Sequence, residues 1–377
     1  MKRSFILFLL LFSIFLINGE TITHKRLMAK FDERIELMSI ICHLAGYPEY
    51  NTDMGGEYIN EIDKYFSDYK KHQAVLMLDS LRRQNGIGYD APMAFAINLQ
   101  KNNDRFTIVN DTIIPERRWQ GVDLEKVTDI FNEFYKDSEF SNFMESHKLF
   151  YEDICNLFDE NVNSKFNQEW YNRFYGMPPL DDFKIVIGFT NGGGNYGPSV
   201  DKTKDNKELY AIIGYALNEK GEPYYLSDPD MYLNTLVHEF NHSFVNPLAN
   251  NPKYKAEIEK AGHELLTLSR KVMRRNAYSN WESIINESLV RAAVILYLMD
   301  NNTGEKEIRQ SIIEEMSIGF YWMPEMVKCL QYYKNNRVIF PTFESYYPKI
   351  IEFFKKFSYN QTEKIDSIFY SEPMRNP

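Results

Sequence analysis

The segment TLVHEFNHSF, residues 235–244, constrains the fold more than any other part of the sequence. Only one of its residues carries a charge, and its apolar residues fall on several sides of a helix, so it predicts a helix that is largely buried. Ser227 or Asp228 can cap the start of this helix, with Pro229 in its first turn. We expect the helix to end before Pro247, because the residue that precedes a proline is disfavoured in helical geometry.

Two histidines and a glutamate in this helix are spaced as a metal site requires. His238 and His242 lie one turn apart on the same helix face, so that both imidazoles can bind one Zn²⁺ at about 2.0–2.1 Å. Glu239 lies about a hundred degrees round the helix from His238, beside the metal, where it can take a proton from a water molecule. Unpaired imidazoles are costly to bury, so the apolar flanks favour a metal site over two unrelated surface histidines.

A zinc site that keeps one position open for water needs a third protein ligand. Our main candidate is Glu287, an acid within the apolar run IINESLVRAAVIL. An ion pair with Arg291 is the structural alternative, but a buried carboxylate needs more compensation, which Zn²⁺ could provide while Arg291 or Asn286 holds the carboxylate. Two other candidates are weaker, because Glu282 fits a capping box and His263 lies in a strongly charged helix.

The resulting ligand set resembles that of the gluzincin branch of HExxH zinc metallopeptidases, in which two histidines are followed by a glutamate from a later helix. The segment NESLVRA is similar to the third-ligand segment of that branch. The metzincin pattern is absent, because Val245 and Leu248 stand where it needs glycine and histidine. More narrowly, HEFNHSFVNP preceded by NGGGNYG resembles an uncharacterised family of secreted bacterial zincins, a domain of unknown function, over about residues 183–298.

The resemblance implies a zincin-like fold and hydrolysis of peptide bonds by a zinc-activated water, with Glu239 as general base and one Zn²⁺ bound by His238, His242 and Glu287. It also implies that an extended substrate adds to a sheet edge, either at the segment ELYAIIGYAL or beside NGGGNYG. The resemblance further implies a Tyr or His donor for the oxyanion, but the sequence does not choose among its many tyrosines, which include Tyr278, Tyr321, Tyr332 and Tyr346.

The glycine cluster before the motif has two interpretations. Gly192, Gly193 and Gly194 could form a flexible hairpin with no further role. Because they lack a Cβ, they could instead let a substrate backbone approach the metal closely. Both interpretations remain open at this point.

The chain as a whole predicts an α+β fold, mostly helical, with a small mixed sheet beside the motif helix. Helical periodicity dominates residues 20–180, where RFTIVNDTIIP could hold a short strand or two. In residues 181–377, FKIVIGF and ELYAIIGYAL predict strands and EPYYLS a weaker one, and helices follow the motif almost to the end. We therefore expect a mainly helical N-terminal half and a zincin-like catalytic half.

The first 19 residues predict an export signal. A basic start and an apolar run of 13 residues precede Gly19, and the run is shorter than the roughly 20 residues of a membrane span. We expect cleavage near Gly19, a periplasmic or extracellular location and no stable membrane insertion afterwards; an uncleaved anchor is the alternative. Removal of Lys2 and Arg3 would take the net charge from −10 to −12, which disfavours nucleic acid as a partner.

Two functions compete at this point. One is a zinc metallopeptidase acting on a peptide or protein substrate. The other is an inactive, zinc-bearing binding protein that uses its aromatic helical surface for a protein or peptide partner. Three ligands with Glu239 beside them favour the peptidase, because a structural zinc site is normally closed by a fourth protein ligand.

Overall fold

A computed structural model describes residues 27–52, 54–110, 114–176, 182–203, 206–276 and 278–371. The fold is α+β and mostly helical, with a small mixed sheet, as the sequence predicts. The predicted export signal lies outside the described residues. The helices are α1 Glu33–Leu44, α2 Glu57–Tyr65, α3 Gln73–Asn85, α4 Asp90–Ile97, α5 Leu124–Asp137, α6 Phe140–Ser146, α7 Lys148–Asn161, α8 Glu169–Tyr175, α9 Tyr224–Ser227, α10 Pro229–Ala249, α11 Pro252–Arg275, α12 Trp281–Asp300, α13 Glu305–Ser317, α14 Met323–Asn335 and α15 Phe343–Ser371.

The main sheet has the strand order β1-β4-β6-β5, from β1 Ala29–Lys30, β4 Asp182–Gly188, β6 Asn206–Gly214 and β5 Ser199–Thr203. Strand β4 is parallel to both β1 and β6, and β5 is antiparallel to β6. The edge strand β5 therefore runs against the others. Strands β2 Leu99–Asn102 and β3 Arg105–Ile108 form a separate hairpin; β3 lies in the segment RFTIVNDTIIP, where we expected a short strand or two, and β2 precedes that segment.

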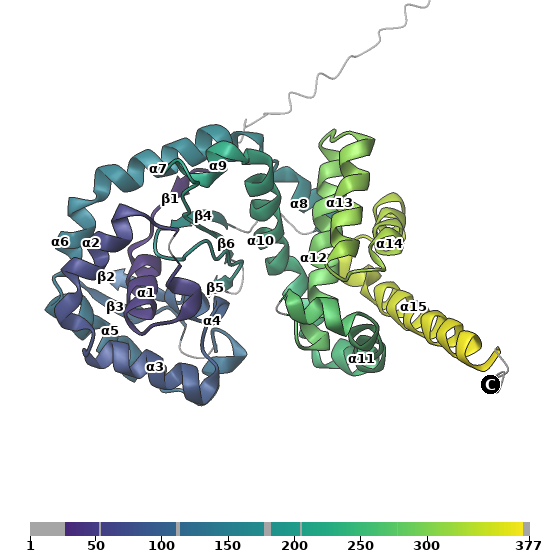
Figure 1. Ribbon diagram of the computed structural model, residues 1–377, viewed down its shortest axis with the longest axis horizontal. Coiled ribbons are helices and arrows are strands. Elements are labelled where there is room, and N and C mark those ends of the chain that lie inside the picture. The colour runs from purple at the N-terminus through teal and green to yellow at the C-terminus, as the bar shows by residue number, and fades with distance from the viewer. Residues whose placement is uncertain are drawn as a thin grey trace, which may run out of the picture.

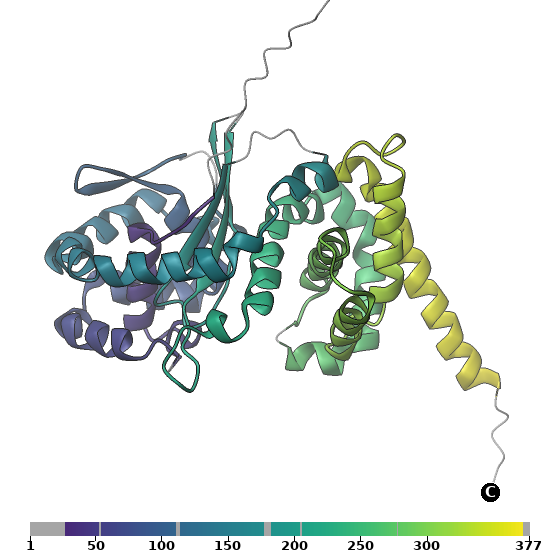
Figure 2. The same ribbon diagram turned by 90° about the horizontal axis from the view of Figure 1, so that it is seen from above.

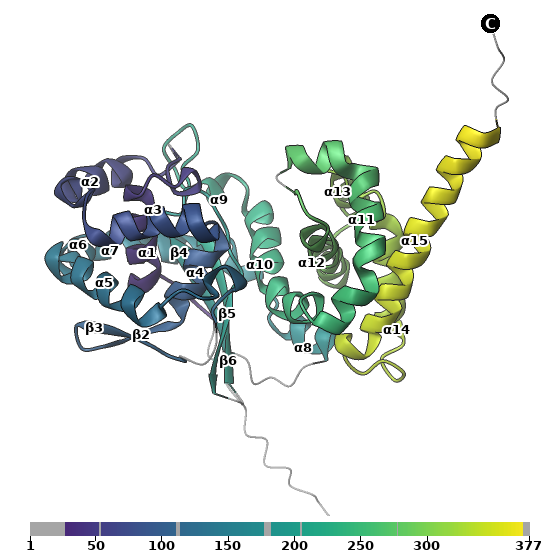
Figure 3. The same cartoon turned by 90° about the horizontal axis from the view of Figure 1, so that it is seen from below.

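The elements form two lobes with α10 between them (Figure 1). One lobe contains α1–α7 and the sheet, and the other contains α11–α15 together with α8, as the views from above and below also show (Figures 2 and 3). Helix α10 packs on β6 on one side and on α12 on the other. Among the described residues, no helix is both long and apolar enough to cross a bilayer.

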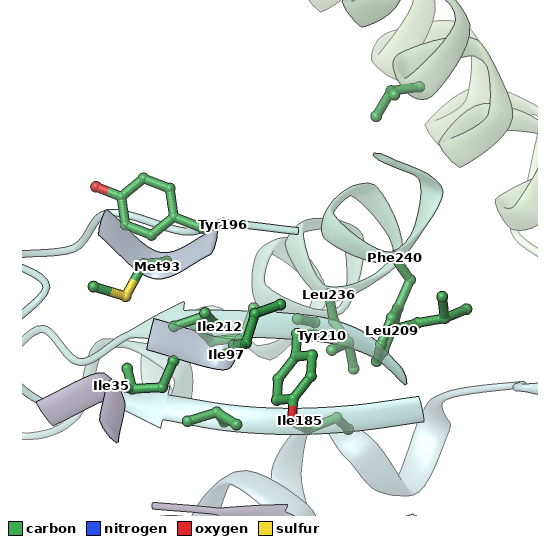
Figure 4. Close-up of a cluster of buried hydrophobic side chains, with 14 of the residues drawn as sticks. Ile35, Met93, Ile97, Ile185, Tyr196, Leu209, Tyr210, Ile212, Leu236 and Phe240 are labelled. Atoms are coloured by element: carbon green, nitrogen blue, oxygen red, sulfur yellow. The ribbon is translucent and has the colours of Figure 1, made fainter. Parts of the chain in front are cut away.

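Apolar side chains fix the motif helix on the sheet. Leu236 and Phe240 of α10 are fully buried and lie beside Leu209 of β6 (Figure 4). Ile212 of the same strand and Ile185 of β4 are also buried. This packing leaves the neighbouring faces of α10 to contact α12, where the predicted third ligand lies.

A buried carboxylate ties α1 to the segment that follows β4. Glu36 is almost inaccessible to solvent, and it accepts hydrogen bonds from the Tyr58 hydroxyl at 2.9 Å and the Phe189 N–H at 3.1 Å. The Thr190 hydroxyl also donates to it. Burial nevertheless raises the pKa of Glu36 above its ordinary value.

The structure corrects the expected end of the motif helix. Asp228 is the N-cap and accepts from the Met231 N–H, as predicted, but α10 continues through Pro247 to Ala249. A proline in the last turn removes only its own N–H, and the Asn250 N–H still bonds to the Asn246 carbonyl at 2.9 Å. The restriction on the residue before proline is therefore overcome here by the surrounding helical bonds.

Three other local predictions were wrong. The weak strand EPYYLS contains the short helix α9, because the Asp228 N–H bonds to the Tyr224 carbonyl and closes a helical turn. The start of α12 is capped by Asn280, whose Oδ1 accepts from the Ser283 N–H at 2.8 Å, rather than by the expected capping box. The segment ELYAIIGYAL is not a sheet edge, because its strand β6 is paired on both sides.

Candidate metal site

Two adjacent helices bring the three predicted ligands together. His238 and His242 belong to α10, Glu287 belongs to α12, and these helices pack side by side. The two His Nε2 atoms lie 3.2 Å apart. Glu287 Oε2 lies 3.5 Å from His238 Nε2, and Glu287 Oε1 lies 3.5 Å from His242 Nε2. One donor atom from each of the three side chains thus lies within 4.8 Å of the others.

The distances between these nitrogen and oxygen atoms suit a tetrahedral metal ion. Two ligand atoms bound to Zn²⁺ at about 2.0–2.1 Å and at tetrahedral angles lie about 3.3–3.4 Å from each other. The donor separations of 3.2 and 3.5 Å bracket that value. Among the described residues, the metal-compatible cluster consists of these three side chains. The residues can therefore hold one metal ion, and their donor types suit zinc.

The orientation of His242 is set by a residue that the sequence interpretation missed. His242 Nδ1 lies 3.1 Å from Asn246 Oδ1, and Asn286 Nδ2 donates to the same oxygen at 2.8 Å. When Asn246 Oδ1 accepts a hydrogen bond from Nδ1–H of His242, the imidazole lone pair is on Nε2, the nitrogen that faces Glu287. Asn286 was expected to hold the Glu287 carboxylate, but it contacts Asn246 instead.

The Glu287 carboxylate is held by the predicted arginine and by one of the candidate tyrosines. Arg291 Nε donates to Glu287 at 3.1 Å, and the Tyr278 hydroxyl donates to the same carboxylate oxygen at 3.2 Å. Arg291 also donates to the Tyr278 hydroxyl at 2.9 Å and to both oxygens of Glu315. The guanidinium is thus fixed from both sides, and it fixes the carboxylate in turn.

Only one of the four tyrosines named from the sequence contacts a ligand. Tyr278 bonds to Glu287, whereas the Tyr346 hydroxyl bonds to the Cys329 carbonyl at 3.0 Å. Tyr321 and Tyr332 are exposed on the surface.

The charges of the ligands suit metal binding. Burial lowers the pKa of His238 to about 3, so its imidazole is neutral at neutral pH. Burial by itself would raise the pKa of Glu287, but His238, His242 and Arg291 lower it to about 2. Since His238 is neutral above its own pKa, the positive charge of Arg291 helps to keep Glu287 ionised at neutral pH.

The glutamate of the motif is buried next to this cluster. Glu239 is 6% exposed, and its pKa is raised well above the ordinary value by burial and by the negative charges of Glu287 and Asp90. Both effects favour the protonated form of the carboxyl in the metal-free site. A metal cation beside it would oppose this shift.

The two weaker ligand candidates lie in other interactions. Glu282 accepts from Arg117 at 3.1 Å and from Lys255. The side chain of His263 is 60% exposed and lies 4.0 Å from Glu259, as expected of a surface histidine.

Comparison with known families places the chain in a group that has no assigned function. The model of the family described as Domain of unknown function (DUF4932) matches residues 27–353. The chain belongs to this family. No curated protein and no solved structure matches it. The DUF4932 match includes both lobes and every residue of the metal cluster, so the site lies within the domain that defines the family.

The glycine cluster of this DUF4932 chain has a packing role. Gly192 and Gly193 have φ angles of +59° and +83°, which favour glycine, and a Cβ on Gly192 would lie 2.7 Å from the Glu49 carbonyl oxygen. A different glycine of the same segment, Gly197, lies close to the motif helix: a Cβ on Gly197 would lie 2.0 Å from the Glu239 carbonyl oxygen. A substrate-binding role for Gly192, Gly193 and Gly194 stays a prediction.

Proposed function

We propose that the protein is a zinc-dependent metallopeptidase. The observation that carries this proposal is the cluster of His238, His242 and Glu287, whose facing nitrogen and oxygen atoms lie 3.2–3.5 Å apart. The metal-compatible cluster in the described part of the chain includes no fourth side chain, so a metal there would keep a position for water or substrate. Buried Glu239 beside the cluster gives that position a proton acceptor.

Each residue of the cluster has a role in this proposal. Zn²⁺ bound by the three ligands would supply Lewis acidity to a peptide carbonyl and to the attacking water. Glu239 would take the proton of that water and pass it to the leaving amine. Asn246 would keep the Nε2 lone pair of His242 directed at the metal, and Arg291 would keep Glu287 ionised.

The edge strand offers a place for the substrate backbone. Because β6 is paired on both sides, the free edge beside the glycine segment belongs to β5. The chain enters β5 directly from Gly197, the residue that lies against the Glu239 backbone. An extended peptide added to this edge would lie close to the Glu239 backbone, which supports binding of the substrate as an added strand at this position.

The test compares peptide cleavage and metal content in matched variants. Wild type, Glu239→Gln and Glu282→Gln are loaded with zinc and incubated with a complex peptide library, and products are identified by mass spectrometry. We expect cleavage by wild type and by Glu282→Gln, and at least a hundredfold loss in Glu239→Gln with zinc retained. Zinc bound in all three proteins without cleavage by any of them would refute the peptidase and favour a zinc-bearing binding protein.

A further inference from the structure

Tyr89 has a backbone conformation that is unusual for a residue with a side chain. Its φ and ψ angles are 55° and −115°, just before α4 begins at Asp90. Positive φ is uncommon for residues other than glycine, and it is especially unfavourable for a bulky side chain. Such strain persists only where the surrounding structure enforces it, and it concentrates at functional sites.

Both polar backbone groups of Tyr89 are held by side chains from the segment that precedes α2. Its N–H donates to Glu49 Oε1 at 2.9 Å, and its carbonyl accepts from the Tyr50 hydroxyl at 2.9 Å. Arg82 in turn fixes Glu49 through two hydrogen bonds, at 2.7 and 3.0 Å. The fold therefore enforces the strained conformation from both sides.

The ring of Tyr89 contributes little to the packing of the fold, because the residue is 57% exposed. The Arg82 guanidinium lies over this ring, 5.9 Å from the ring centre. Glycine would satisfy the same backbone bonds without strain. A large aromatic side chain at this position therefore indicates a role other than stabilising the fold.

Two connections place Tyr89 near the motif helix. Tyr50, which bonds to its carbonyl, stacks on Tyr196 with ring centres 6.3 Å apart. The next residue, Gly197, lies against the backbone of Glu239. Tyr50, Tyr196 and Gly197 thus form a chain of contacts from the strained backbone to the proposed general base.

The second connection runs through the helix that follows Tyr89. Helix α4 begins at Asp90 and packs against the edge strand β5. Arg118 donates a hydrogen bond to the Asp90 carboxylate. Arg118 also donates to the Gly88 carbonyl at 2.9 Å, so the residues on both sides of Tyr89 are fixed. The strained residue therefore has a rigid backbone and precedes a helix that packs on the edge strand proposed to bind substrate, where an exposed ring can meet a bound peptide.

We propose that Tyr89 is a specificity-determining residue whose ring receives an aromatic or large aliphatic side chain of the peptide bound beside Glu239. The inference rests on the proposed function, since it assumes a peptide ligand. An exposed aromatic ring with a rigid backbone contributes contact area at little entropic cost, which is why tyrosine is common in binding surfaces. The strain is then maintained because it positions the ring.

The test measures peptide binding and thermal stability in the same variants. Zinc-loaded Glu239→Gln protein is immobilised and offered short peptides whose central position carries each amino acid in turn; retained peptides are identified by mass spectrometry. Tyr89→Gly and Tyr89→Phe are added to this background. The matched control is Glu139→Gly, which relieves another positive φ, of 49°. Glu139 is the N-cap of α6, a helix that lies far from α10 (Figure 1).

We expect the starting protein to retain peptides with Phe, Tyr, Trp, Leu or Met at the varied position. Tyr89→Gly should weaken this preference about tenfold, and Tyr89→Phe should keep it. The melting temperatures of Tyr89→Gly and Glu139→Gly should both rise by a few degrees, because strain is relieved, while Glu139→Gly leaves the preference unchanged.

Three outcomes would overturn the inference: no retained peptide, an unchanged preference in Tyr89→Gly, or a lower melting temperature in that variant, which would make the ring structural. Wild type that binds these peptides without cutting them would refute the peptidase alone. Failure of the proposed function can thus be told apart from failure of the Tyr89 assignment.

Discussion

Asn246 provides a sharp test of the metal site, because its role follows from geometry alone. Its Oδ1 accepts from His242 Nδ1 at 3.1 Å and from Asn286 Nδ2 at 2.8 Å. In Asn246→Ala both hydrogen bonds disappear, and the imidazole loses the contact that fixes its tautomer and ring orientation. Loss of such a contact typically weakens metal affinity by about 10–100-fold, which corresponds to about 1.4–2.8 kcal/mol at 25 °C.

A second substitution separates hydrogen bonding from packing. Asn246→Asp has nearly the same size, and its carboxylate can accept from both His242 and Asn286. We therefore expect Asn246→Asp to bind zinc at least as tightly as wild type, because a carboxylate acceptor makes the imidazole a stronger ligand. If Asn246 acted only by filling space, Asn246→Asp would bind zinc no more tightly than wild type, because the two side chains have nearly the same size.

The assay is a competition titration of zinc between each metal-free protein and a chromophoric chelator at fixed pH. The melting temperature of each metal-free variant verifies that it is folded. Wild-type zinc affinity in a folded Asn246→Ala protein would refute the reasoning. An equal loss of affinity in Asn246→Ala and Asn246→Asp would also refute it, because the acceptor would then be irrelevant.

Four further outcomes are expected. Purified Glu287→Ala should lose zinc, measured by plasma emission, whereas Glu282→Ala should keep it; the reverse would show that the ligand assignment is wrong. Gly197→Ala should lower the melting temperature far more than Gly304→Ala, because its Cβ would lie 2.0 Å from a helix carbonyl oxygen, while a Cβ on Gly304 would meet only the movable carboxylate of Glu307; similar effects would contradict the close approach. Since burial raises the pKa of Glu36, its ionisation opposes folding, so urea titrations should show wild type losing stability relative to Glu36→Gln as pH rises above 4.5; a constant difference would contradict this sign. N-terminal sequencing of exported protein should show that the basic and apolar leader has been removed, whereas an intact N-terminus in a membrane fraction would support an anchor.

The motif helix and the ligand pair it carries could be predicted because their signal is local. Helical spacing alone puts His238 and His242 on one face. Glu287 could be found because an acid in an apolar run needs a compensating partner. Arg291 and Tyr278 hold that acid. The Arg291 contact follows from helical spacing, because Arg291 is one turn from Glu287 in α12. The Tyr278 contact does not, because Tyr278 precedes α12.

The remaining parts of the site depend on features that short patterns do not encode. Asn246 is one turn beyond His242, but it was missed because the helix was expected to end before Pro247. Strand β1 has only two residues, too few for an alternating pattern, and its partner is distant in sequence. Tyr89 is not distinguished in the sequence at all, because a strained φ angle results from contacts made by other segments.

The placement of β1 determines the order in which the N-terminal lobe can be completed during synthesis. Ala29 and Lys30 leave the ribosome early, yet their partners in the sheet are Ile185 and Val186. Strand β4 in turn pairs with β6, which is made later still. A nascent chain that stops before residue 182 therefore has helices but no partner for β1, and its main sheet cannot form. Pairings of this kind are slow to nucleate because a long loop must close first, so the lobe that comes first in the sequence should acquire its native core only after most of the chain has been made.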